Sequence, residues 1–341
     1  MRGTRPTARR PFLVHLVLGA SRRDANLEEA QTVQVSSTRT GLRLAAGGAA
    51  LLLAAGCATS GGSSARSPAP APVQPSNPPA SASAASTPVV AGPATTGVPP
   101  GTGLKPYTGP TTITTPGTVI DAATITDCLV IKADDVTISR SRITSPGCQF
   151  NVLSDAGNTG LRLVDVEIDG QDNTTGDSAV AGAGYTCLRC DVQGTTDGFK
   201  AGSDVTIQDS WIHDLAMTKE SHNDGVQSLG TNRLTIGGST IVLADGATSA
   251  VILSTGSASA MRNVSISDNV LGGGAFTVYG GYSAGEDDVA KVSGIAITNN
   301  RFSTKIHPRS GAYGPITSAD PPVVVSGNTW YDGPEAGRSL S

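Results

Sequence analysis

The chain has 341 residues, with 24 Lys and Arg against 28 Asp and Glu. The charge is divided unevenly: residues 1–106 carry 10 basic and 3 acidic side chains, whereas residues 107–341 carry 14 basic and 25 acidic ones. Because the second part has a net charge of −11, it would repel phosphate backbones, which argues against nucleic acid as a partner.

Residues 1–34 are not expected to belong to a folded domain. They include "RRDANLEEAQTVQ", whose acidic groups precede a basic and then apolar stretch. We interpret them as an upstream extension from a misplaced start codon, with translation beginning near Val35.

Residues 35–56 have a basic flank and an apolar body that is too short to span a bilayer as a mature helix. The stretch ends in "LAAGC", which resembles the lipobox of bacterial lipoprotein signal peptides, although Ala54 stands where leucine is usual. The resemblance implies cleavage before Cys57 and acylation of its thiol. The alternative is an ordinary secretory signal with a chance cysteine.

Residues 57–110 are dominated by Pro, Ala, Ser, Gly and Thr, as in "SPAPAPVQPSNPPASASAAS". Such a segment has too little apolar mass to offset the entropy of ordering. We expect a disordered linker that holds a domain away from a membrane surface.

From about residue 111 one pattern recurs: apolar, any, apolar, two of any kind, small polar, any, apolar. The eight copies begin 20 to 31 residues apart and are "VTISRSRI" at 136, "LRLVDVEI" at 161, "YTCLRCDV" at 185, "VTIQDSWI" at 205, "LTIGGSTI" at 234, "VSISDNVL" at 264, "IAITNNRF" at 295 and "VVVSGNTW" at 323. The first two apolar positions predict a strand with one buried face, and the third begins another strand after a bend.

Repeats of this period predict stacked units. A β-propeller would need about 40 residues or more per blade. The pattern resembles the right-handed parallel β-helix of the pectin-lyase-like superfamily over about residues 113–332. We therefore expect an all-β domain at 111–333, a single parallel β-helix of about eight to nine coils, and a disordered tail at 334–341. The small polar positions would stack as a ladder along one corner: Ser141, Ser210, Ser239, Asn269, Asn300 and Asn328.

Four cysteines remain besides Cys57, an even number that suits an exported domain. Cys128 and Cys148 occupy similar positions one short coil apart, and Cys187 and Cys190 lie across one bend. We predict disulfides 128–148 and 187–190 rather than a zinc site, because a single C-x-x-C is a weak metal pattern.

The densest polar set follows two equivalent strand entrances, "TTDGFKAGS" (195–203) and "HNDGVQSLG" (222–230). Stacking would place Asp197 on Asp224 and Lys200 on Gln227, at a coil spacing of about 4.8 Å. His222 and Asn223 lie beside them, next to the lengthened connection "MTKESHN" (217–223). Later coils carry no charge at these places.

The order of these motifs is similar to the polygalacturonase family, which has an "NTD" motif and, one coil later, a "DD" motif. The resemblance places Asp197 and Asp224 in the acidic set. Asn223 stands where the first aspartate of "DD" belongs, and neither "GHG" nor "RIK" follows.

Two carboxylates beside a glycosidic bond suffice for hydrolysis, whereas a lyase needs a base and a cation for the uronate carboxylate. We assign candidate catalytic roles to Asp197, Asp224 and His222, and substrate contacts to Lys200, Gln227 and Asn223. The alternative is that both aspartates only cap turns, since strict alternation would point them inward with Phe199. His213 and Asp214 fall in a turn that we expect to be solvated.

These features predict an exported, surface-anchored monomer that cleaves or binds a polysaccharide, expected to contain uronate, along a groove. No cofactor or metal is expected except calcium, which could bridge an anionic chain to the acidic domain. The alternative function is a non-catalytic binding or cell-envelope module.

Overall fold

The computed structural model describes residues 90–255 and 260–340. The upstream extension, the signal segment and the lipidation candidate Cys57 lie outside the described residues, as does the linker up to residue 89. In the described part, no helix is long and apolar enough to cross a membrane.

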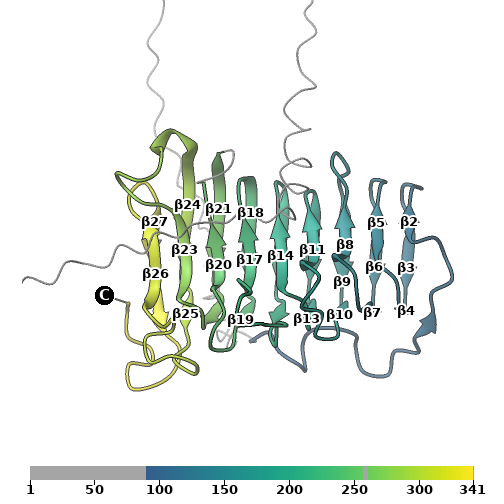
Figure 1. The fold of residues 1–341 in the computed structure, drawn as a ribbon, viewed down its shortest axis with the longest axis horizontal. Coiled ribbons are helices and arrows are strands. Elements are labelled where there is room, and N and C mark those ends of the chain that lie inside the picture. The colour runs from purple at the N-terminus through teal and green to yellow at the C-terminus, as the bar shows by residue number, and fades with distance from the viewer. Residues whose placement is uncertain (1–89, 256–259, 341) are drawn as a thin grey trace, which may run out of the picture. The chain divides into compact units, whose positions relative to one another are not determined.

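Three parallel sheets run side by side along a β-helix (Figure 1). The first contains β1 Lys105–Pro106, β4 Ala123–Ile125, β7 Arg142–Thr144, β10 Glu167–Asp169, β13 Asp191–Gln193, β16 Trp211–Ile212, β19 Thr240–Val242, β22 Val270–Gly272, β25 Arg301–Phe302 and β28 Thr329–Trp330. We call it sheet A.

Sheet B contains β2 Thr112–Ile113, β5 Leu129–Ile131, β8 Phe150–Ser154, β11 Ser178–Gly182, β14 Asp197–Ala201, β17 Asp224–Ser228, β20 Ser249–Leu253, β23 Phe276–Tyr282 and β26 Gly314–Ala319. Sheet C contains β3 Val119–Asp121, β6 Thr137–Ser139, β9 Leu161–Val164, β12 Tyr185–Leu188, β15 Val205–Gln208, β18 Thr231–Gly237, β21 Met261–Ser267, β24 Val292–Thr298 and β27 Val324–Ser326. The helical element η2, Val289–Lys291, is a single 3₁₀ turn.

The repeated pattern maps directly onto this architecture. Its first two apolar positions form a strand of sheet C, and its third belongs to the following strand of sheet A, as in β9 and β10. Each strand pairs in parallel with its equivalent one coil away. The predicted all-β parallel β-helix is therefore confirmed.

One residue per coil adopts a left-handed conformation at the bend between sheets C and A, as at Asp165 (φ 57°) and Asp209 (φ 50°). Asp, Asn and Gly tolerate this region best. Arg189 occupies the same place with φ 52° and forms an ion pair with Asp165, with Nε 2.6 Å from Oδ1.

The polar ladder beside this bend is confirmed. Four of the six members accept a hydrogen bond on the side-chain oxygen from the backbone N–H of the member one coil earlier: Ser239 from Ser210 at 3.1 Å, Asn269 from Ser239 at 2.9 Å, Asn300 from Asn269 at 3.1 Å and Asn328 from Asn300 at 2.9 Å. Ser141 and Ser210 accept in the same way from Ala123 and Cys190, each at 3.0 Å. These side chains are buried, so the ladder satisfies backbone donors that the bend leaves unpaired.

Both predicted disulfides are present. Cys128 bonds Cys148 and Cys187 bonds Cys190, with Cα–Cα distances of 5.7 and 5.9 Å. Disulfides persist in oxidising compartments, which favours a location outside the reducing cytoplasm.

The predicted boundaries of the domain need correction at both ends. Inside the expected linker, the N–H of Gly97 donates to Arg189 O, and β1 pairs with β4. Inside the expected tail, Leu340 N donates to Asn328 O. Composition suggested disorder at both places, but these backbones hydrogen-bond to coils that are distant in sequence.

Candidate functional site

Asp197 and Asp224 lie at equivalent places on neighbouring strands of sheet B. Phe199 pairs with Val226 and Lys200 with Gln227, as predicted from the two motifs. The backbone N–H of Asp224 donates to Asp197 Oδ1 at 2.8 Å, which joins the two coils at the carboxylate position.

A break in alternation turns both aspartates outward. A Cβ at Gly198 would meet the Ile212 side chain and the Gly225 carbonyl, so this position faces the core directly before the core residue Phe199. With two consecutive inward positions, Asp197 and Lys200 share the outer face. Gly225 repeats the break on the next coil, where a Cβ would meet Ile241.

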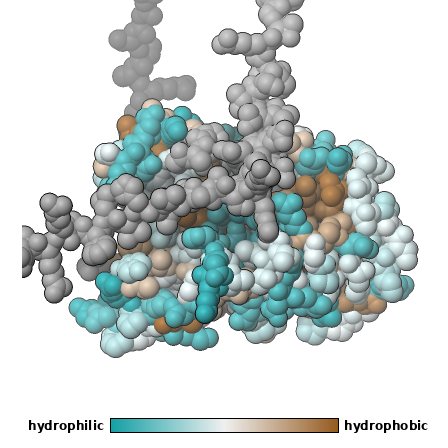
Figure 2. Space-filling view, in the orientation of Figure 1, coloured by the Kyte–Doolittle hydropathy of each residue, from teal (hydrophilic) through white to brown (hydrophobic). Residues whose placement is uncertain are grey.

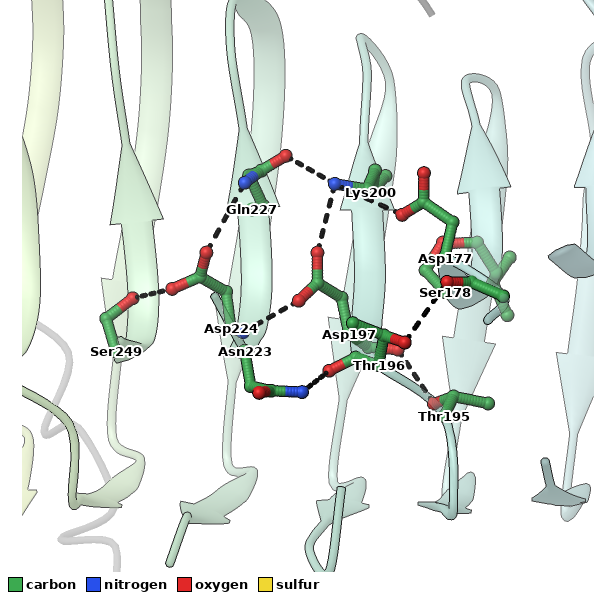
Figure 3. Close-up of polar contacts among 12 residues, drawn as sticks. Asp177, Ser178, Thr195, Thr196, Asp197, Lys200, Asn223, Asp224, Gln227 and Ser249 are labelled. Carbon is green, nitrogen blue, oxygen red and sulfur yellow. Dashed lines mark hydrogen bonds and ion pairs between the residues drawn. The ribbon is translucent and has the colours of Figure 1, made fainter. Parts of the chain in front are cut away.

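Lys200 is the centre of the polar cluster (Figure 3). Its Nζ lies 3.0 Å from Asp197 Oδ2 and 3.2 Å from Asp177 Oδ1, and it donates to Gln227 Oε1 at 2.7 Å. The side chain is only 10% exposed. The cluster therefore spans three consecutive strands, β11, β14 and β17.

Asp224 has a different environment. Its carboxyl group accepts hydrogen bonds from Ser249 Oγ and, at 3.3 Å, from Gln227 Nε2. Ser249 pairs with Asp224 across β17 and β20. Among the described residues, no cation forms an ion pair with Asp224 as Lys200 does with Asp197.

Burial raises the pKa of both aspartates. For Asp197, burial outweighs the opposing charge of Lys200 and raises the pKa to about 6. For Asp224, burial and then the charge of Asp197 raise the pKa well above its ordinary value. Because Lys200 contacts Asp197, the ionised carboxylate belongs at Asp197 and the retained proton at Asp224. Burial alone would lower the pKa of Lys200, but Asp197 and Asp177 outweigh it and raise the pKa, so the ammonium stays charged.

The other predicted site residues lie apart from this pair. His222 is exposed, and no hydrogen bond or ion pair joins it to another described residue. Asn223 is buried, and its Nδ2 donates to Thr196 O and to Ala216 O, the latter at 2.8 Å. Asn223 therefore anchors the loop that precedes β17, and both of its amide hydrogens are used.

The sequence did not predict Asp177 or Ser249 as site residues, nor that Phe276 and Tyr313 would form an aromatic cluster with Tyr279. Phe276 lies 5.7 Å from Tyr279 and 5.8 Å from Tyr313, measured between ring centroids. Tyr279 follows Gln227 and Ile252 in one outer row of sheet B. Burial, and then the charge of Asp224, raise the pKa of Tyr279, which is consistent with a position near the carboxylates.

A sequence signal for Asp177 did exist. "GDSAVAGAG" (176–184) aligns with "TDGFKAGS" one coil later, and Ser178 pairs with Asp197. Two other aromatic side chains do not join the cluster: Tyr282 packs in the core, and the Trp211 ring stacks on His213 with centroids 3.4 Å apart.

His213 is buried rather than solvated as expected. Its Nε2 lies 2.9 Å from Asp191 Oδ1 and its Nδ1 lies 2.7 Å from Asp214 Oδ2. Burial alone would lower its pKa, but the hydrogen bonds to Asp191 and Asp214 outweigh burial and raise it. These contacts are made on sheet A, away from the cluster on sheet B.

Within residues 90–255 and 260–340, no group of three or more His, Cys, Asp or Glu side chains could hold a metal ion. The carboxylates of Asp177 and Asp197 converge instead on the ammonium group of Lys200.

The fold and its cysteines define a disulfide-bonded parallel β-helix protein. No protein-family model matches the chain, and no curated protein matches it. A solved structure, the endo-xylogalacturonan hydrolase from Aspergillus tubingensis, matches with a TM-score of 0.32 and 15% identity, over 67% of this chain and 91% of that chain. A similarity this low assigns neither a family nor an activity to this chain.

Proposed function

We propose that this protein binds a polysaccharide along the outer face of sheet B and hydrolyses it with Asp197 and Asp224. The observation that carries the proposal is the carboxylate pair on the outer side of sheet B, buried there at 2% and 1% exposed, in which Lys200 contacts Asp197 and no described cation forms an ion pair with Asp224. A hydrolase needs one carboxyl group that keeps its proton and one that has lost it.

The roles follow from these environments. Asp224 donates its proton to the glycosidic oxygen as the bond to the anomeric carbon breaks. Asp197 removes a proton from the water that attacks this carbon, or attacks the carbon itself. Gln227 contacts Asp224 and Lys200 and can orient a sugar hydroxyl.

Aromatic residues extend the site in the direction of the stacked coils. One strand, β20, separates β17 from β23, to which Phe276 and Tyr279 belong. Tyr313, 66% exposed, adds a ring that is open to solvent. Aromatic faces stack on the apolar faces of sugars, so this cluster supplies a second contact along one chain.

A substitution of Asp224 tests the proposal. Since the pKa of Asp224 is raised, Asp224→Asn should retain stability within about 1 kcal/mol and reduce turnover by roughly 10² to 10⁴-fold. Turnover is measured on a polysaccharide panel by reducing ends, with ultraviolet absorbance to detect unsaturated lyase products. Asp155→Asn, at a half-buried position paired with Lys132 through a side chain that is 40% exposed, is the matched control and should behave as wild type. Wild-type turnover in folded Asp224→Asn would show that the pair is structural.

Burial favours a second candidate, a non-catalytic binding module. Asp197 and Asp224 are 2% and 1% exposed, and both carboxyl groups accept hydrogen bonds from the protein. If the protein is such a module, members of the polysaccharide panel bind but no products form. Asp224→Asn then lowers the free energy of unfolding and has no separate effect on binding.

Anchoring through Cys57 belongs to the same proposal and is supported by the "LAAGC" sequence. Cys57→Ala should release the folded domain from the membrane fraction into the medium. If the variant still partitions with detergent, the cysteine is not the anchor.

A further inference from the structure

We infer that the site on sheet B takes uncharged sugar units and excludes uronates at the carboxylate cluster. This inference rests on the proposed function and names its substrate class. It departs from the uronate-containing chain expected from the sequence.

The first argument is that Lys200 has no donor left for a substrate carboxylate. An ammonium group has three N–H donors, and three acceptors lie around Nζ: Asp197 Oδ2 at 3.0 Å, Asp177 Oδ1 at 3.2 Å and Gln227 Oε1 at 2.7 Å. To bind Lys200, a uronate carboxylate would have to displace one of these three acceptors from the ammonium group.

The second argument is the charge of the outer row in which Lys200 lies. Strand pairing defines this row along sheet B, and its other members are all uncharged: Val130, Leu153, Ala181, Gln227, Ile252, Tyr279 and Thr317. Against the one cation of this row stand two ionised carboxylates, Asp177 and Asp197, while Asp224 keeps its proton. A uronate would therefore meet like charge in a poorly solvated place.

The third argument is that the surroundings suit neutral sugars. Carboxylate and amide oxygens accept hydrogen bonds from sugar hydroxyls. The rings of Phe276, Tyr279 and Tyr313 offer stacking surface at one end of the row. On the other side, an apolar area lies near β8 and β11 beside hydrophilic surface (Figure 2).

Lys219 is the described cation closest in sequence to Asp224. It belongs to the loop before β17 and is exposed. If a uronate bound by surface charge instead of at the cluster, Lys219 would contribute to it. It therefore supplies a control.

The test compares pairs of oligosaccharides that share one linkage and differ only by oxidation at C6: α-1,4-linked galactan with polygalacturonate, and β-1,4-linked mannan with mannuronan. Titration calorimetry with the full chain should give at least tenfold tighter binding of each neutral member, with little change between 50 and 500 mM salt, concentrations chosen to span strong screening. The oxidised member is measured with calcium and with a chelator, and chitosan serves as a cationic chain.

Tighter binding of a uronate, with or without calcium, would overturn the inference and leave the proposed function intact. Chitosan that binds tenfold better than any neutral chain would also overturn it. If no glycan of the panel binds, both the inference and the proposed function are wrong.

A variant tests the mechanism of exclusion. Asp177→Asn removes one negative charge and leaves Lys200 a weaker, uncharged acceptor in its place, so the ratio of uronate to neutral-chain affinity should rise severalfold. Lys219→Gln should leave binding of the neutral chain unchanged. An unchanged ratio in folded Asp177→Asn would show that Lys200 does not determine the exclusion.

Discussion

At the scale of single residues, two glycines determine where the aspartates point. Gly198 and Gly225 face the core, so each is followed by a second inward residue, Phe199 or Val226. Without this break the carboxyl groups would be buried in the core, where an unpaired charge costs several kcal/mol. A Cβ at Gly198 would meet backbone and core atoms, so even alanine would have to shift the strand.

His213 supports a pH prediction at the same scale. Its pKa is raised in the folded protein, so its stabilising contribution is fully present below the unfolded value of about 6.5 and is lost as pH rises through the folded value. We expect His213→Asn to lower the free energy of unfolding by roughly 1 to 3 kcal/mol at pH 5.5, and by less at pH 8.5.

Denaturant midpoints across this pH range measure the effect. His307→Asn is the control, because His307 lies 3.3 Å from Asp245, whose side chain is 85% exposed, and exposed pairs contribute little. A deficit for His213→Asn that does not change with pH would mean that packing on Trp211, rather than charge, holds the histidine.

At the scale of the element, the sequence predicted sheets C and A well because each coil repeats the same local requirements. Alternating apolar residues form the sheet C strand, a left-handed residue makes the bend, and a buried Ser or Asn closes it in six of the eight copies. These requirements are local, so they are visible as an eight-copy pattern. The strands of sheet B follow connections of variable length, and their outer residues differ from coil to coil.

At the scale of the whole molecule, the end segments cover coils that would otherwise be open. A β-helix ends in unpaired strand edges, which promote association between molecules. Residues 105–106 pair with β4, and Ser339 bridges Thr329. The segments predicted to be linker and tail therefore belong to the domain.

Truncation tests this role of the N-terminal segment. A chain that begins at residue 111 should lose the β1–β4 pairing and the Gly97 contact, lower Tm by about 4 °C or more, and associate on size-exclusion chromatography. A chain that begins at residue 90 should retain the Tm of the full chain and is the control. If both truncated chains melt at the same temperature, the folded domain begins after residue 110, as the sequence predicted.

The sequence by itself determined the β-helix, the ladder and both disulfides, because each depends on a spacing that stacking of equal coils converts into contact. It also brought Asp197 to Asp224 and Lys200 to Gln227. Only the tertiary structure decided that Asp177 shares Lys200, that Asn223 anchors a loop and that His222 stands apart. It alone placed residues 90–110 on the domain. These outcomes depend on a one-residue break in alternation and on contacts between distant segments, which no local pattern records.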